Sequence, residues 1–137
     1  MSLRFTVYQG QPILVANFFE TVNLDDFREW ALRLPYYTRM FQAQQVYHII
    51  DISRALIDGY AIQNVFEQER GRWGLIDFKN AGGKRVKGWI VGDTVATQTV
   101  FHLIGKAELG GAYLPTLTNL NSALYAIHSE QKYASTH

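Results

Sequence analysis

Two apolar runs near the start of the chain predict a β-hairpin. Phe5 and Val7 alternate with polar residues, whereas residues 13–16 are apolar without interruption. Alternation is typical of a strand with one buried face, and an uninterrupted run is typical of a strand that is buried on both faces. Gly10 and Gln11 suit a two-residue turn that begins with glycine. We therefore expect an antiparallel hairpin whose second strand lies further inside the sheet.

The next pattern has helical spacing. Apolar side chains recur every three or four residues on one helical face, at Leu24, Phe27, Ala31 and Leu34. Asn23 is a favourable N-cap, and the two acidic residues in the first turn complement the helix dipole. Pro35 disfavours helical backbone in the residue before it. The pattern predicts a helix over residues 24–34.

Apolar runs and helical patterns then alternate to the end of the chain. The expected strands are residues 46–52, 88–92 and 111–114, and the expected helices are residues 60–69, residues 94–104 and a last helix capped by Thr116 or Thr118. Residues 80–85 have the composition of a loop. A hairpin followed by strand–helix alternation predicts an α/β fold, with a mixed, mostly parallel sheet of four to five strands and helices mainly on one face. We expect a single domain over residues 1–131 and a frayed tail over residues 132–137.

The composition narrows the classes of function. With 137 residues, of which 47% are hydrophobic, the chain is long and apolar enough to bury one core. It has no cysteine, which excludes disulfides and thiolate metal ligands. A net charge of +1 provides no basic excess for nucleic acid. The N-terminus lacks the pattern of a signal peptide and no apolar run reaches about 20 residues, so we expect a cytoplasmic protein without a membrane span.

Two acidic residues mark the carboxyl ends of predicted strands. Asp51 and Asp93 close the apolar runs 46–52 and 88–92, and parallel strands bring such positions to one edge of a sheet, where open α/β sheets bind ligands. Two carboxylates at that edge could hold a magnesium ion or act as acid and base. The alternative is that both are turn formers and helix caps. No third ligand or phosphate-binding loop accompanies them, so we expect neither a metal nor a cofactor.

Other catalytic motifs are incomplete. His48, His102 and His128 are far apart and form no HxH or HxxxH pair. No serine lies in a G-x-S-x-G motif. Gly83-Lys84 lacks the glycine that a Walker A loop has five positions earlier, where Phe78 stands, and Arg85 replaces the following Ser or Thr, which favours a solvated basic loop. We therefore predict that the chain is not an enzyme.

The order of the predicted segments resembles a known family. The segments are the opening hairpin, the capped helix, the strand that ends with Ile49–Ser53, the run Gly88–Asp93 and the threonine-capped last helix. Together they resemble the STAS domain, the SpoIIAA-like fold of bacterial anti-sigma-factor antagonists. The resemblance covers nearly the whole chain and rests on topology and apolar spacing. It implies a non-catalytic regulatory module that acts through protein–protein contacts.

The resemblance also implies where a partner would bind. In the phosphoswitch members, a turn aspartate leads into serines at the start of the next helix. Asp58 matches that aspartate, but Gly59 and Tyr60 stand in place of the serines and Ser53 lies upstream, which argues against a serine phosphoswitch. The implied surface is the loop 51–58 with the start of the next helix and the later helix N-terminus. Its candidate residues are Asp51, Ser53, Asp58, Gly59, Tyr60, Asp93 and Thr94.

Aromatic residues outside the regular elements leave two alternatives open. Tyr36, Tyr37 and Phe41 follow Pro35, and Trp73 lies in an unassigned stretch. These side chains would either complete the core under a long loop or line a pocket for an apolar, lipid-like ligand. Exposed aromatics beside an open sheet edge would instead favour homodimers or larger homo-oligomers.

Overall fold

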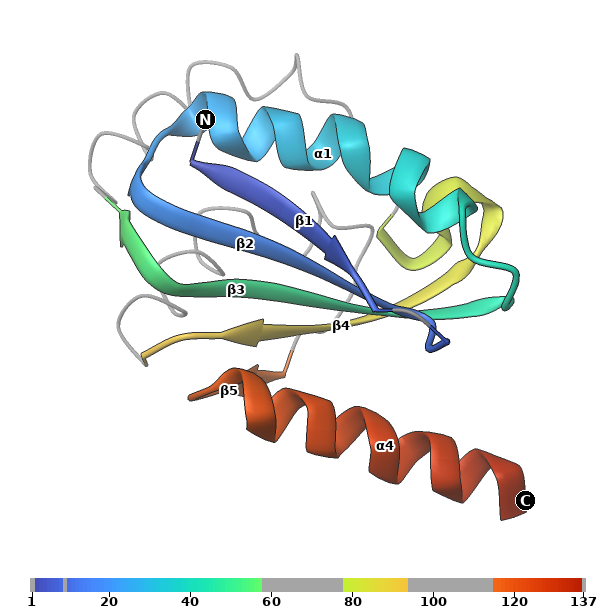
Figure 1. Cartoon of the computed structure of the whole chain (residues 1–137). Coiled ribbons are helices and arrows are strands. Elements are labelled where there is room, and N and C mark those ends of the chain that lie inside the picture. Colours follow the sequence, from blue (N-terminus) through green and yellow to red (C-terminus); the bar gives the residue numbers. More distant parts are fainter. Residues whose placement is uncertain (1, 9, 58–77, 94–114, 137) are drawn as a thin grey trace.

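The computed structural model describes residues 2–8, 10–57, 78–93 and 115–136 (Figure 1). Its elements in chain order are β1 (Leu3–Val7), β2 (Ile13–Val22), α1 (Leu24–Arg39), β3 (Gln45–Ile57), the 3-10 helix η1 (Phe78–Gly83), β4 (Arg85–Val91), β5 (Thr116–Leu117) and α4 (Leu120–Thr136). Three predicted elements lie outside the described residues. They are the helices over residues 60–69 and 94–104 and the strand over residues 111–114. No helix within the described ranges is long and apolar enough to cross a membrane.

The sheet confirms the predicted class. Within the described residues its five strands lie in the order β1-β2-β3-β4-β5, with β1 antiparallel to β2 and the other neighbours parallel. The runs predicted at residues 46–52 and 88–92 pair side by side in the same direction, and Asp51 lies opposite Val91. The fold is therefore α/β with a mixed, mostly parallel sheet.

The N-terminal hairpin is confirmed, although its second strand is longer than predicted. Val7 pairs with Leu14, and the Tyr8 N–H donates to the Ile13 carbonyl oxygen at 3.1 Å. Gly10 has a φ of 75°, a left-handed conformation that glycine adopts without steric cost. The second strand continues to Val22, beyond the end of its apolar run.

Helix α1 begins where the sequence predicts and ends later. Asn23 and Asp26 form a capping box, in which each side chain accepts the other residue's backbone N–H, at 3.2 and 2.9 Å. The expected stop at Pro35 is wrong, because the helix continues to Arg39. Leu34 and Thr38 are fully buried, and the Thr38 hydroxyl donates to the Leu34 carbonyl oxygen at 2.7 Å. Burial of this last turn offsets the hydrogen bond that proline cannot make.

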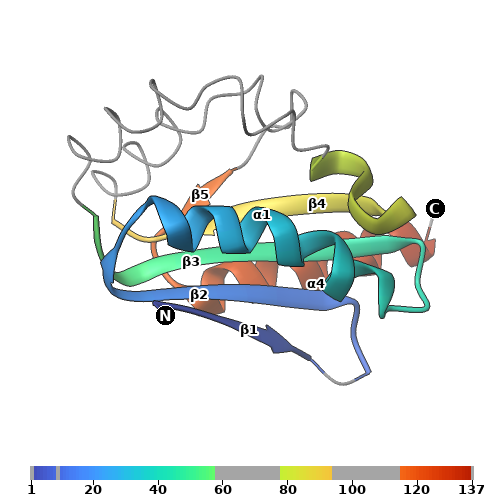
Figure 2. The same ribbon diagram turned by 90° about the horizontal axis from the view of Figure 1, so that it is seen from above.

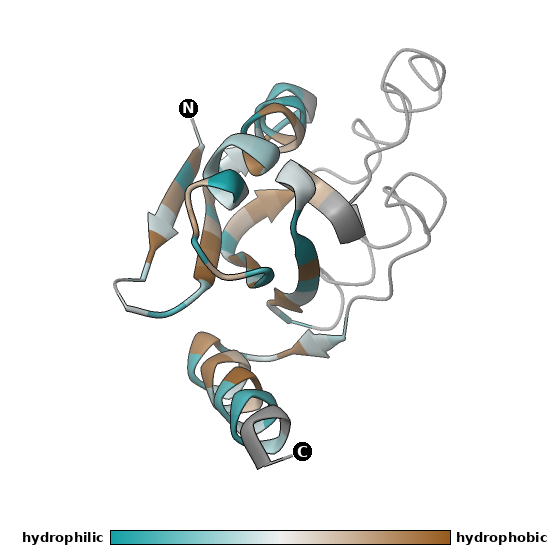
Figure 3. Cartoon of the chain, turned by 90° about the vertical axis from the view of Figure 1, so that its right-hand side faces the viewer, coloured by the Kyte–Doolittle hydropathy of each residue, from teal (hydrophilic) through white to brown (hydrophobic). Residues whose placement is uncertain are grey.

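The two faces of the sheet are covered separately. The core cluster beneath α1 includes Leu14, Ala16 and Ile50, and the cluster beneath α4 includes Ile13 and Ile49. Figures 1 and 3 show α1 and α4 on opposite sides of the strands, with apolar strand segments between them. The two described helices, α1 and α4, thus lie on opposite faces, whereas the other two helices expected mainly on one face lie outside the described residues. Strands β2 and β3 carry apolar side chains on both faces, so both faces need a cover.

The glycine-rich segment before β4 is a packing element. η1 lies beside α1 on the same side of the sheet (Figure 2). Gly82 has a φ of 65°, and a Cβ built there would lie 2.6 Å from the Pro35 carbonyl oxygen. Only glycine permits this approach of η1 to α1. Residues 80–83, predicted as a loop, therefore form part of a 3-10 helix, and β4 begins at Arg85.

The end of the chain differs from the prediction by a few residues. Thr116 lies in the short strand β5 and not at a helix cap. The cap of α4 is Asn119, whose Oδ1 accepts the Ser122 N–H at 2.8 Å. The helix continues to Thr136 and so includes most of the predicted tail. An ion pair between Lys87 of β4 and Glu130 accompanies the apolar contacts that hold α4 on the sheet.

His48 joins three elements inside the α1-facing core. The Trp30 Nε1–H of α1 donates to His48 Nε2 at 2.9 Å, and His48 Nδ1 lies 3.0 Å from the Leu14 carbonyl oxygen of β2. Because Nε2 accepts, Nδ1 carries the proton and donates. Burial lowers the pKa of His48 to about 4, so the ring is neutral at pH 7. The histidine is a satisfied core residue.

Candidate functional site

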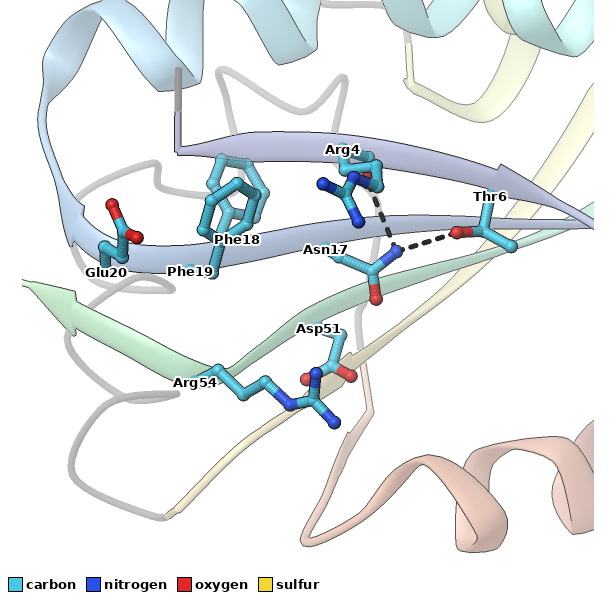
Figure 4. Close-up of a pocket in the computed structure, with 8 residues that line it drawn as sticks. All are labelled: Arg4, Thr6, Asn17, Phe18, Phe19, Glu20, Asp51 and Arg54. Atoms are coloured by element: carbon cyan, nitrogen blue, oxygen red, sulfur yellow. Dashed lines mark hydrogen bonds between the residues drawn. The ribbon is translucent and has the colours of Figure 1, made fainter.

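An open hollow of about 580 Å³ lies on the sheet face that carries α4. Its lining comes from Arg4 and Thr6 of β1, residues 17–20 of β2, and Asp51 and Arg54 of β3 (Figure 4). The hollow lies along the second halves of the parallel strands β2 and β3, beyond the part of the sheet that α4 covers (Figure 1). Most of the side chains that line it are polar or charged.

The strand alternation explains why polar side chains gather at this place. On β2, Ile13 and Val15 pack beneath α4, and Asn17 is the next residue on that face. On β3, Ile49 packs beneath α4, and Asp51 is the next residue on that face. On this face of β2 and β3, the side chains therefore change from apolar to polar where α4 no longer covers the strands.

A β-bulge brings Arg54 to the same face as Asp51. Asn17 pairs with Asp51 but Phe19 pairs with Arg54, so β3 contains one more residue than β2 over this stretch. In a regular strand, residues three apart point to opposite faces. Beyond the bulge, Ala55 and Ile57 pack against the α1-facing core. The bulge accommodates the extra residue, so that Ala55 and Ile57 stay on the core face and Arg54 points towards the hollow.

Asp51 and Ser53 are brought together as partners at this bulge. Asp51 Oδ1 accepts the Ser53 backbone N–H at 2.9 Å and the Ser53 hydroxyl at 2.6 Å. Both residues lie within β3, so the predicted end of this strand at Ile52 and the predicted loop over residues 51–58 are wrong for residues 51–57. The strand continues because Ala55 and Ile57 add alternate apolar contacts to the core and pair with β2.

Asn17 forms the floor between β1 and β3. Its Nδ2 donates to the Arg4 carbonyl oxygen at 3.2 Å and to the Thr6 hydroxyl oxygen at 3.0 Å (Figure 4). Both amide protons are therefore used within the hairpin. No described residue donates to the amide oxygen, which is an acceptor on the hollow side.

The two arginines of the hollow make no ion pair with any described residue. The Arg4 guanidinium carbon lies 5.8 Å from the centre of the Phe19 ring, a cation–π contact that orients the group. Arg54 reaches the hollow from the other side of β2. On α1, by contrast, Arg28 pairs with Asp25 and Arg33 pairs with Glu29, at 2.9 and 2.8 Å.

Glu20 contributes an unusual backbone to the same hollow. Its φ is 58°, and it is the one non-glycine residue with a positive φ in the described ranges. This left-handed conformation costs an L-residue about 1–2 kcal/mol. Such strain is concentrated at functional sites, where the surrounding structure holds it in place.

The other predicted residues fall in three groups. Asp93 is exposed, two residues beyond the end of β4, whereas Asp58, Gly59, Tyr60, Thr94 and Trp73 lie outside the described residues. Tyr36 is 62% exposed, while Tyr37 stacks on Phe5 with ring centres 4.5 Å apart. Phe41 packs against the α1-facing core. The contacts of Tyr37 and Phe41 are those of core packing.

Sequence reasoning missed most of the hollow. The missed lining residues are Arg4, Thr6, Asn17, Phe18, Phe19, Glu20 and Arg54. A usable signal was the alternation of β1, which places Arg4 and Thr6 on the face opposite Leu3 and Phe5. The bulge shifts by one residue which side chains of β3 face the core, and nothing in the sequence indicated this shift.

Comparisons with protein-family models and with curated proteins found no match to this chain. The geometry of the hollow is therefore the basis for a functional proposal.

Proposed function

We propose that this chain is a non-catalytic regulatory module that binds a protein partner at the hollow between Arg4 and Arg54. The observation that carries the proposal is the coincidence of three irregularities in one open hollow. These are the bulge at Asp51, the left-handed backbone of Glu20 and two arginines without ion pairs among the described residues. The STAS resemblance supports the same class of function, with Asp51 as the shared residue.

This surface differs from an ordinary exposed strand in its energetics. A left-handed glutamate costs stability, and a bulge interrupts the strand ladder. Exposed ion pairs stabilise a fold only slightly, and Arg4 and Arg54 form none with a described residue. The bulge also keeps Ala55 and Ile57 on the core side. The strained Glu20 backbone and the two outward arginines add nothing to that core, so a requirement for recognition explains them better than packing does.

The composition of the hollow favours a protein partner over an apolar ligand. Four of its side chains carry full charges, namely those of Arg4, Glu20, Asp51 and Arg54. An apolar ligand would have to desolvate these groups without replacing their hydrogen bonds with water. Protein surfaces supply matching charges and backbone groups, as polar interface rims do.

Site-specific crosslinking tests the proposal. A photo-crosslinking amino acid in place of Thr6 places the probe in the hollow, and the same amino acid in place of Tyr36 is the control on exposed α1. We expect position 6, in extracts of the native host, to give a discrete adduct that position 36 does not give. Arg54→Glu should abolish that adduct, whereas Arg33→Glu on α1 should retain it. Equal adducts at both positions, or indifference to Arg54→Glu, would show that the hollow is not the partner surface.

A further inference from the structure

We infer that the partner inserts a carboxylate group, carried by an aspartate, a glutamate or a chain end, between the guanidinium groups of Arg4 and Arg54. This inference rests on the proposed function and specifies the chemistry of its contact. Its basis is the placement of the two arginines, the hydrogen bonds already made around them and the charge balance of the hollow.

The strand order places the two guanidinium groups on either side of one floor. Arg4 lies on β1 and Arg54 on β3, with β2 between them. Arg4 is opposite Asn17 and Arg54 is opposite Phe19, two residues further along β2. With a strand spacing of about 4.8 Å and a rise of about 3.3 Å per residue, their backbones are roughly 12 Å apart. Figure 4 shows both side chains over the hollow, with Asn17 between them. A group that sits over residues 17–19 of β2 is therefore within reach of both long side chains.

Both arginines have donors to offer. Each guanidinium carries five N–H groups in a planar fork that matches the two oxygens of a carboxylate. Neither forms an ion pair with a described residue. The contact of Arg4 with the Phe19 ring, 5.8 Å from the guanidinium carbon to the ring centre, uses none of the five N–H groups as a hydrogen-bond donor to an oxygen.

The charge balance favours one negative charge over two. Arg4 and Arg54 are offset by Asp51 and Glu20, which line the same hollow. One oxygen of Asp51 is occupied by Ser53, at 2.9 and 2.6 Å. A carboxylate adds a single charge, whereas a phosphoryl group adds up to two and meets stronger repulsion from Asp51 and Glu20. The hollow therefore suits a carboxylate better than a phosphate.

Asn17, at the floor of the hollow, favours a carboxylate that belongs to a peptide over a small free carboxylate such as acetate. The amide protons of Asn17 are donated to the Arg4 carbonyl oxygen and the Thr6 hydroxyl, which leaves Asn17 Oδ1 as an acceptor. A peptide has backbone N–H groups beside its acidic side chain, and one of them can donate to this oxygen. Acetate has no such donor.

Small probes test this chemistry directly. The full chain, labelled with 15N, is titrated with N-acetyl-aspartate N-methylamide while the arginine Nε–H resonances are followed by NMR. We expect saturable shifts of Arg4 and Arg54 in the millimolar range, with weaker binding of acetate and of inorganic phosphate. N-acetyl-asparagine N-methylamide, in which a neutral amide of nearly the same shape replaces the carboxylate, should cause no saturable shift.

Matched variants identify the groups responsible. Arg4→Gln and Arg54→Gln should each weaken binding of the aspartate probe by about tenfold or more, because each removes a charge-assisted hydrogen bond. Arg33→Gln, which removes a charge from α1 instead, should leave it unchanged. Tighter binding of phosphate than of the aspartate probe, or equal shifts with the asparagine probe, would overturn the inference.

The two proposals fail separately. If the position 6 adduct forms and depends on Arg54 while no carboxylate probe binds, the carboxylate inference is wrong and the partner surface stands. If the aspartate probe binds but the adduct ignores Arg54→Glu, the carboxylate site stands and its assignment to a protein partner is wrong.

Discussion

The polar side chains on the two faces of β3 differ in burial and in how far their hydrogen bonds are satisfied. On the α1 side, His48 has no exposed surface, and its ring nitrogens are engaged by Trp30 and the Leu14 carbonyl. On the other side, Asp51 and Arg54 border an open hollow, and Arg54 has no ion pair in the described part of the chain. Buried polar groups are stable only when they are satisfied, whereas donors left free at a surface are available to a ligand. The first arrangement serves the fold, and the second leaves capacity for binding.

The largest effect should follow from breaking the buried side. Trp30→Ala should reduce the free energy of unfolding by about 4 kcal/mol, because it leaves a cavity and removes the hydrogen bond to His48 Nε2. Urea denaturation measures the change. Tyr36→Ala on the same helix is the control, since this side chain is 62% exposed and its loss should cost no more than about 0.5 kcal/mol. Equal losses would show that the His48 side of the core is not specially stabilised.

The pH dependence of stability should come from the same buried histidine. The folded pKa is about 4 and the ordinary value is 6.5, so below pH 6.5 the unfolded chain binds a proton that the folded chain does not. Stability should therefore be independent of this group above pH 6.5 and fall progressively towards pH 4. The full loss is about 3 kcal/mol.

Denaturation at several pH values between 7 and 4 checks this prediction. His48→Gln should be less stable at pH 7 but should show a flatter pH dependence over that window. An unchanged slope in this variant would place the proton uptake on other groups.

A smaller effect of opposite sign should arise at the hollow. Glu20→Gly should increase the free energy of unfolding by about 1 kcal/mol, because glycine adopts the φ of 58° without the cost that glutamate bears. Thr21→Gly, one residue away in β2, is the control and should destabilise by about 0.5–1 kcal/mol. If both variants lose stability equally by thermal denaturation, the Glu20 backbone carries no strain.

The smallest effect on stability should come from the arginines. Arg4→Gln and Arg54→Gln should each change the free energy of unfolding by no more than about 0.5 kcal/mol, because neither side chain has an ion pair to lose among the described residues. The same variants should weaken carboxylate binding strongly. A stability loss above about 1 kcal/mol would mean that these arginines are structural.

The parts of the fold that follow from local patterns were predictable. Asn23 and Asp26 encode the start of α1 within a few residues, and the apolar runs encode β3 and β4 as parallel neighbours. The end of α1 was not predictable from Pro35, because burial of Leu34 and Thr38 outweighs the local preference of proline.

The candidate site was predictable only in part, for a related reason. Asp51 was identified because it follows an apolar run. Arg54 could not be placed beside it, because residues three apart share a face of a strand only if a bulge intervenes. Arg4 was within reach of prediction, because the predicted hairpin and the alternation of β1 place it on the face opposite Leu3 and Phe5. The register in which β2 pairs with β3 joins distant residues and leaves no trace in a local pattern.

The bulge in β3 also makes this segment tolerant of one particular deletion. Between the pairs Asn17–Asp51 and Phe19–Arg54, β3 advances by three residues and β2 by two. Deleting one residue between Asp51 and Arg54 would make the strand regular, because both strands would then advance by two residues, and Arg54, Ala55 and Ile57 would keep their faces. Deleting two residues would reverse those faces and turn the arginine towards the core. Evolution and protein engineers alike can therefore shorten this segment by one residue without exchanging its inner and outer side chains.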